Sequence, residues 1–295
     1  MNRLFCFGMG YSAQALAKRL ELSGWSIEAT ARSPARKNLL QSAGFQAILF
    51  DDAIEALKKS PEQATHVLVS APPAISGDPV LDAFEAELTK LSPKPKWLAY
   101  LSTTGVYGDH AGQWVDEETP TQPSSERAKR RVEAEVAWQD WGVRSGVPVQ
   151  IFRLAGIYGP GRNQIESLKA GTARCLIKEG QVFSRIHVDD IAATLEASIS
   201  RPNAGRVYNV CDDEPAPPHE VVEYAAKLLA MPPPPHERFE DAASTLSEMA
   251  LSFYSESKRV RNQRIKIELN VKLQYPSYRE GLRAINLKLL TRPKP

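Results

Sequence analysis

Short apolar, β-prone runs recur along the chain and alternate with segments of helical periodicity. The runs occupy residues 3–8, 26–31, 45–50, 65–71, 97–103, 149–154, 182–187 and 206–211. Amphipathic spacing fills most of the gaps between them, at about 12–23, 34–42, 80–91 and 125–141. Near-continuous apolar strands joined by helices are typical of a parallel sheet that is covered on both faces. The pattern therefore predicts an α/β fold with a doubly wound (Rossmann) parallel sheet.

The regular alternation weakens after about residue 160, where loops and prolines become frequent. We therefore predict a dinucleotide-binding Rossmann domain over residues 1–160, with strands near 183–187 and 206–211 returning to its sheet. Residues 161–182 and 212–295 would form a smaller, C-terminal substrate-binding portion. Within it, Pro232 to Pro235 should be a stiff extended connector.

The first predicted strand leads into a glycine-rich turn, Gly8-Met9-Gly10-Tyr11-Ser12-Ala13. A glycine turn can serve only to join a strand to a helix. Here it follows the first strand of an alternating chain, and Ala13 still permits close packing of the helix on the strand. Gly8, Gly10, Tyr11 and Ser12 are therefore predicted to cradle a pyrophosphate at the helix amino terminus.

The end of the second predicted strand bears on cofactor choice. An NAD site usually places an acidic residue there, but this chain reads Arg32-Ser33 with Arg36 shortly after. A guanidinium can pair with a 2′-phosphate through two parallel hydrogen bonds. We therefore predict NADP in preference to NAD, although Arg32 could instead be an exposed residue at a helix start. Asp51 would meet the adenine edge or, about as readily, cap the following helix.

The amino-acid composition restricts the classes of binding partner that the chain can have. The chain has 295 residues, a formal net charge of +2 and charged residues of both signs, so no basic field indicates nucleic acid. Its three cysteines and five histidines show no metal-ligand spacing, and we predict no metal site. No signal peptide or membrane span is evident. A reducing, cytoplasmic location is expected.

Several longer motifs resemble one known family. They are Leu101 to Gly108 (LSTTGVYG), Phe152 to Arg162 (FRLAGIYGPGR), Ile186 to Ala192 (IHVDDIA), Ser257 to Val260 and Tyr275 to Leu282. In this order they resemble the extended short-chain dehydrogenase/reductases, the NAD-dependent epimerase/dehydratase proteins. The glycine loop and the segment Ser70-Ala71-Pro72 are similar to an atypical subgroup, so these three residues are assigned to cofactor binding.

The resemblance also implies catalytic roles. Family members use a Tyr-x-x-x-Lys pair, in which the tyrosine exchanges a proton and the lysine lowers its pKa and binds the nicotinamide ribose. Lys129 matches the lysine, and Ser125 stands where the tyrosine would be. Lys129 could instead be a surface lysine paired with Glu133, and Ser125 a helix cap. Thr103 and Thr104 would orient a substrate oxygen.

Substrate contacts are assigned to residues within or beside the matched motifs. They are Tyr107, Tyr158, Arg162, His187 and Arg259. Tyr107 and Tyr158 could supply a replacement phenol, although their positions favour packing. Asp189 is most simply the cap of the following helix.

Two classes of function remain open at this point. One is an NADP(H)-dependent epimerase, dehydratase or reductase that acts on a hydroxyl or carbonyl of a nucleotide-sugar-like small molecule. The other is a catalytically impaired NADP(H)-binding sensor or regulatory protein, which the serine at position 125 favours. A homodimer through the helix at 125–141 is also predicted from the resemblance.

Overall fold

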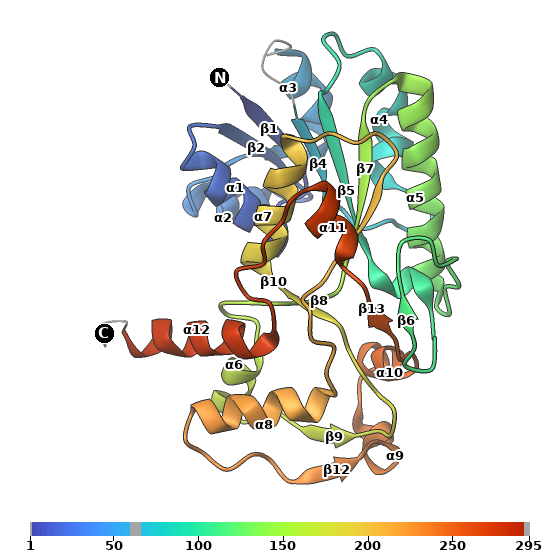
Figure 1. The fold of residues 1–295 in the computed structure, drawn as a ribbon. Helices are drawn as coiled ribbons and strands as arrows, with labels where there is room; N and C mark the ends of the chain where they lie inside the picture. The colour runs from blue at the N-terminus through green and yellow to red at the C-terminus, as the bar shows by residue number, and fades with distance from the viewer. Residues whose placement is uncertain (1, 60–65, 292–295) are drawn as a thin grey trace.

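The computed structural model describes residues 2–59 and 66–291 and is organised around a seven-stranded parallel sheet (Figure 1). The strand order is β11-β7-β5-β4-β1-β2-β3. The chain therefore changes direction between β1 and β4, which is where doubly wound sheets bind ligands beyond the carboxyl ends of their strands. The strands are β1 (Arg3–Phe7), β2 (Ser26–Ala31), β3 (Gln46–Leu49), β4 (His66–Val69), β5 (Trp97–Thr103), β7 (Val149–Leu154) and β11 (Val207–Val210).

Alternate side chains of each strand enter two separate cores. In β1, Leu4 and Cys6 face one core, whereas Phe5 and Phe7 face the other. Helices cover both faces, which explains why the strands read as continuous apolar runs. The first face carries α1 (Tyr11–Glu21), α2 (Pro34–Ser42), α7 (Val188–Ile199) and α11 (Gln263–Glu268). The second carries α3 (Ala53–Lys59), α4 (Pro79–Thr89) and α5 (Glu126–Ser145).

The predicted sheet is confirmed, with one correction. The run at 206–211 returns to the sheet as β11, which pairs with β7. The run at 182–187 does not return to it. Its strand, β10 (Arg185–His187), pairs with β8 (Gly156–Tyr158) in a separate two-stranded sheet. Periodicity identified a strand at this point, but the choice of pairing partner depends on long-range packing. Residue 65 of the predicted fourth strand lies outside the described residues.

The C-terminal portion lies at one end of the large sheet (Figure 1). Its core joins α6 (Gln164–Lys169), α8 (Pro218–Leu228) and α12 (Tyr278–Leu290). Two further strand pairs complete it or connect it to the sheet domain. They are β9 (Cys175–Ile177) with β12 (His236–Arg238), and β6 (Trp114–Val115) with β13 (Arg259–Val260). The short helices α9 (Phe239–Ala242) and α10 (Glu248–Tyr254) follow β12.

Candidate functional site

A cavity of about 870 Å³ extends from the amino end of α1 to the C-terminal portion. Its first wall is formed by Gly10 to Ala13, Ser70 and the end of β5. Its second wall is formed by the start of α5, the segment after β7, and residues of β10, α10 and β13. Sequence positions from 10 to 282 therefore meet in one space. This is the crevice that the strand order predicts.

The glycine loop is fixed from beneath by hydrogen bonds. The Gly8 amide donates to Thr30 Oγ1 at 3.0 Å, and Ser70 Oγ donates to the Gly8 carbonyl at 2.9 Å. Gly8 has φ +88°, and a Cβ at this position would lie 3.0 Å from Ser70 Oγ. Gly8 is therefore required by the turn itself, and Ser70 both supports the loop and lines the cavity.

Gly10 has a different role, because it faces the open cavity. It is the N-cap of α1 and provides no capping side chain, and the first turn of the helix carries no acidic residue. A Cβ at Gly10 would have no described atom within 4 Å. The amino end of α1 is thus uncapped, open and not opposed by a carboxylate of its own first turn. These features fit a pyrophosphate group well.

The residues assigned to the adenosine end lie outside the cavity just described. Arg32 and Asp51 are exposed beyond β2 and β3. Ser33 is the N-cap of α2, and its Oγ accepts from the Arg36 amide at 3.3 Å. The Arg36 guanidinium donates to the Met9 carbonyl at 3.0 Å, so it braces the glycine loop. Asp51 lies within a 3-10 turn, η1 (Phe50–Asp52), that precedes α3.

Two other residues assigned to cofactor binding follow β4. The Ala71 amide donates to the Phe7 carbonyl at 3.1 Å, and the residue is buried beneath the glycine loop. Pro72 is exposed. Neither residue lines the cavity, so within this segment the structure brings only Ser70 to it.

Both threonines at the end of β5 line the cavity. Thr103 Oγ1 accepts from the Gly105 amide at 3.1 Å and caps the 3-10 turn η2 (Thr104–Tyr107). Ser102 also lines the cavity, and its Oγ donates to the buried carboxylate of Glu135. The end of β5 thus presents three hydroxyl side chains.

The assignment of Lys129 needs correction. Its Nζ lies 2.7 Å from the carboxylate of Glu126, not Glu133, and the lysine side chain is 52% exposed. Lys129 does not line the cavity. The buried face of α5 instead includes Trp138 and Trp141, and Lys129 precedes Trp138 by nine residues, about two and a half helical turns. Lys129 therefore points away from the face that Trp138 occupies.

Ser125 lines the cavity but serves as the N-cap of α5. Its Oγ accepts from the Ala128 amide at 3.2 Å. Of the helix itself, Arg127, Ala128 and Arg131 reach the cavity. Arg131 donates to the Leu101 carbonyl at 2.8 Å and to Tyr100 Oη at 3.1 Å, so the helix presents a fixed guanidinium there.

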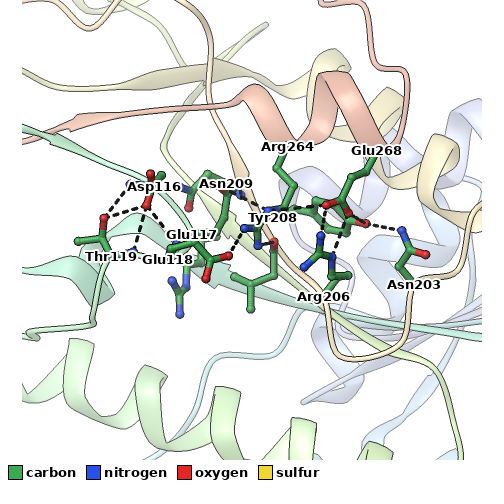
Figure 2. A network of polar contacts seen from close by, with 12 residues as sticks. Asp116, Glu117, Glu118, Thr119, Asn203, Arg206, Tyr208, Asn209, Arg264 and Glu268 are labelled. Atoms are coloured by element: carbon green, nitrogen blue, oxygen red, sulfur yellow. Dashed lines mark hydrogen bonds and ion pairs between the residues drawn. The ribbon is translucent and has the colours of Figure 1, made fainter.

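Tyr107 belongs to a buried polar network and does not line the cavity. Its hydroxyl donates to Asn209 Oδ1 at 2.8 Å and accepts from Arg153 at 2.9 Å. Burial raises the pKa of Tyr107 to about 12. Figure 2 shows that Asn209 continues this network: its backbone amide donates to Glu117 Oε1 at 2.8 Å. The assignment of Tyr107 to substrate binding is therefore corrected.

Tyr158 and Arg162 do reach the cavity. The Tyr158 hydroxyl donates to the Ser277 carbonyl at 3.3 Å, and burial raises its pKa well above the ordinary value. Tyr11 lines the cavity as well, and its hydroxyl donates to the Pro160 carbonyl at 2.9 Å. The glycine loop and the turn after β8 are thus joined by a tyrosine.

His187 and Arg259 have structural roles outside the cavity. His187 is 1% exposed and caps α7, since its Nδ1 accepts from the Asp189 amide at 3.1 Å. The histidine, not Asp189, is therefore the cap. Burial lowers the pKa of His187 to about 4, so the ring is neutral. Arg259 donates to the Gly112 carbonyl, where β13 pairs with β6.

Comparison with known proteins agrees with this geometry. The family model of the NAD-dependent epimerase/dehydratase family matches residues 8–211. This chain belongs to that family. Protein YeeZ of Escherichia coli K12 is 26% identical over 94% of this chain and 97% of its own length. A solved structure of a functionally unknown conserved protein from Silicibacter pomeroyi is 47% identical, with TM-score 0.89 over 99% of this chain and 100% of that one.

Another relative is the dTDP-D-glucose 4,6-dehydratase of Mus musculus, 28% identical over 50% of this chain and 38% of the mouse protein. The family predicted from the motifs is thus confirmed, together with its Rossmann fold and its nicotinamide dinucleotide cofactor class. The chain is related to sugar-nucleotide dehydratases and epimerases. Across residues 2–59 and 66–291, no helix combines the length and apolar character needed to cross a bilayer.

Several residues that line the cavity were not among those predicted from the sequence. The charged ones are Arg127, Arg131, Glu166, Arg185, Glu256 and Lys258. Counting back seven residues, about two turns, from the buried Trp138 would have identified Arg131. Lys258 lies within the matched motif Ser257 to Val260, but the direction of its side chain depends on the pairing of β13 with β6.

Proposed function

We propose that this protein is an NADP(H)-dependent epimerase, dehydratase or reductase that acts on a hydroxyl or carbonyl group of a sugar-nucleotide-like molecule. One observation carries the proposal. A single cavity contains the open amino end of α1, the hydroxyls at the end of β5 and several cationic side chains of the opposite wall. Such a cavity would hold the pyrophosphate and nicotinamide of a dinucleotide beside a second, anionic molecule.

Two regions support binding of the cofactor: the glycine loop and the end of β2. Gly10, Tyr11 and Ser12 would receive the pyrophosphate on backbone amides. Arg32 follows β2 directly, at the position where an acidic residue would select NAD. Its exposed guanidinium would pair with a 2′-phosphate. When bound, the nicotinamide supplies hydride transfer.

The chain's own residues would position the second molecule. Thr103 and Thr104 present hydroxyls at the end of β5 that would orient a substrate oxygen. Arg131 would occupy the ribose-binding role first assigned to Lys129, because it lines the cavity and is fixed there by its hydrogen bond to the Leu101 carbonyl. Arg127 and Arg162 line the cavity and would attract phosphate groups.

The division of the chain also stays a proposal. Residues 1–160, with β11, would bind the cofactor, and the C-terminal portion would bind the substrate. The segment around α11 lies on the other side of this division. Its residues Ile265, Leu269 and Val271 belong to the core beneath the large sheet. The proposed substrate portion therefore excludes this segment.

A second function is favoured by a specific feature. The cavity face of α5 carries Arg127, Ala128 and Arg131 and no phenol. A cofactor-binding sensor or regulatory protein would need no proton donor there. This alternative predicts tight NADPH binding without turnover.

A substrate screen separates these functions. NADPH and NADP⁺ binding is measured first by calorimetry. NADPH formation or loss is then followed with UDP-glucose, dTDP-glucose and GDP-mannose, and products are examined for epimerisation or loss of water. Turnover of any of them supports the enzyme, whereas binding of NADPH with no turnover supports the sensor. Failure to bind either cofactor contradicts both.

Assembly remains a proposal as well. Trp138 and Trp141 are buried in the monomer, whereas Val136 on α5 is 51% exposed. We propose a homodimer through this outer face of α5. Light scattering at micromolar concentration tests it, and a monomer would contradict it.

A further inference from the structure

Lys258 and Glu256 form a polar pair in the second wall of the cavity. Lys258 Nζ lies 2.6 Å from Glu256 Oε2, and the two side chains are only 11% and 13% exposed. Glu256 also accepts from Ser124 Oγ, and Lys258 Nζ donates to the Gly108 carbonyl at 2.6 Å. The pair is thus fixed by hydrogen bonds to two other segments of the chain.

These contacts place the ammonium at a defined point. Gly108 directly follows η2, the turn that begins at Thr104, so Lys258 is hydrogen-bonded to the end of the turn that follows β5. Ser124 precedes the cap of α5, so Glu256 is held at the start of that helix. The pair therefore joins the two elements on which the family's serine or threonine and its tyrosine were expected.

A lysine ammonium carries three N–H donors. Among the described residues, Gly108 and Glu256 account for two of them. Because Lys258 lines the cavity, a substrate oxygen is the natural acceptor for the third. Lysine and tyrosine have similar ordinary pKa values, about 10.4 and 10, so an ammonium can replace a phenol as proton donor.

The other polar groups of the cavity are less suited to this task. The guanidinium groups of Arg127 and Arg131 do not release protons. The hydroxyls of Tyr11 and Tyr158 already donate to backbone carbonyls. Burial raises the pKa of Tyr278 to about 12, and its hydroxyl is enclosed in the protein.

Tyr254 is the remaining cavity phenol, and its ring is held between two others. The centroid distances are 5.5 Å to Phe183 and 4.8 Å to Phe239. Burial raises its pKa as well. The tyrosine is therefore a packing residue and serves as a comparison in the test below.

We propose that Lys258 is the proton donor of this cavity, and that Glu256 positions it. This inference rests on the proposed enzymatic function. It names the group that would donate the proton that the family's tyrosine donates, since Ser125 stands at the tyrosine's position. In carbonyl reduction, hydride from NADPH adds to the carbonyl carbon, and the π electron pair moves to oxygen. The proton moves from Lys258 Nζ to that oxygen and gives the alcohol. Lys258 then regains a proton from water.

Substitution by arginine separates proton donation from positioning. Lys258→Arg keeps the positive charge and the N–H donors but cannot release a proton. The assay follows NADPH oxidation with phenanthrenequinone, a generic dicarbonyl probe, and with any sugar nucleotide that the screen identifies. We expect Lys258→Arg and Lys258→Met to lower kcat about 100-fold or more, with NADPH affinity unchanged. Glu256→Gln should lower it about tenfold, and Lys129→Met, the matched exposed lysine, should not change it.

The pH profile provides a second readout. The dependence of kcat on pH should differ between the wild type and Lys258→Arg, because only the lysine can give up a proton. Normal turnover by Lys258→Arg, or a loss in Tyr254→Phe that equals the loss in Lys258→Met, would overturn the proposal and leave the enzymatic function standing. NADPH binding with no turnover of any probe by the wild type would overturn both.

Discussion

Two lysine–glutamate pairs lie near the start of α5 and have opposite surroundings. Lys129 and Glu126 are 2.7 Å apart, with side chains 52% and 76% exposed. Lys258 and Glu256 are 2.6 Å apart, with side chains 11% and 13% exposed. The first pair is local to one helix turn, whereas the second joins segments that lie far apart in the sequence. The contacts are alike, but only the second pair can meet a ligand in the cavity.

The two walls of the cavity show the same contrast. The first wall comes mainly from one continuous segment, Gly10 to Ala13, and from strand ends beside it. The opposite wall is assembled from Arg127, Arg162, Arg185 and Lys258, which belong to four separate segments. A local motif is visible in a sequence, but a wall built from distant segments is not. The predictions below test whether the walls act separately.

The largest effect is expected at Gly10. We expect Gly10→Val to reduce NADPH affinity by about 100-fold or more, because its branches would occupy the space that the pyrophosphate needs. The protein should remain folded, since no described atom lies within 4 Å of a Cβ there. Calorimetric titration and circular dichroism check the two statements. Unchanged NADPH affinity in Gly10→Val would show that this loop only joins β1 to α1.

A smaller effect is expected at the adenosine end of the same wall. Arg32→Asp should shift the ratio of NADPH to NADH affinity towards NADH by about 10- to 100-fold, because it replaces a cation by a repelling carboxylate. Lys37→Asp, a charge change on the following helix, is the control. Equal affinity of the wild type for NADPH and NADH would contradict the assignment of Arg32.

The comparison of cations on α5 can be tested directly. Arg131→Met should weaken NADPH binding by about tenfold, because it removes a charged hydrogen-bond donor from the cavity. Lys129→Met should change it less than twofold, since that side chain is exposed outside the cavity. If Lys129→Met had the larger effect, the register assigned to α5 would be wrong.

A pH measurement tests the structural role of His187. The neutral ring contributes stability that is complete above the ordinary pKa of about 6.5 and is lost as pH falls towards its folded pKa of about 4. The free energy of unfolding should therefore fall by about 1 to 2 kcal/mol between pH 7 and pH 5 through this residue. His187→Asn keeps a capping acceptor for the Asp189 amide and should flatten that decline in urea titrations. An unchanged slope would show that the pKa of His187 is the same in the folded and unfolded states and would contradict this role.

The smallest effect concerns the exposed pair itself. Lys129→Met should leave the free energy of unfolding almost unchanged, as is usual for a surface ion pair. Thermal unfolding of this variant beside Lys258→Met checks the contrast. Equal destabilisation would remove the distinction between the two pairs.

The sequence by itself determined the features that depend on neighbours along the chain. The period of apolar residues gave the parallel sheet, since strands buried on both faces must be apolar throughout. The spacing of Gly8, Gly10 and Ala13 located the glycine loop at the start of α1, because its amides come from consecutive residues. Ser125 was recognised as a possible cap for the same reason.

Only the tertiary structure decided which side chains share the cavity. The family motif assigned Lys129 to the cofactor site, but its side chain is 52% exposed, because the buried Trp138 and Trp141 fix the orientation of α5. His187 and Tyr107 belong to matched motifs, yet long-range packing buries them in a cap and a polar network. Lys258 reaches the cavity because β13 pairs with β6 and its Nζ binds Gly108, 150 residues away. Contacts of such sequence separation arise from the packing of whole elements, and no local pattern records them.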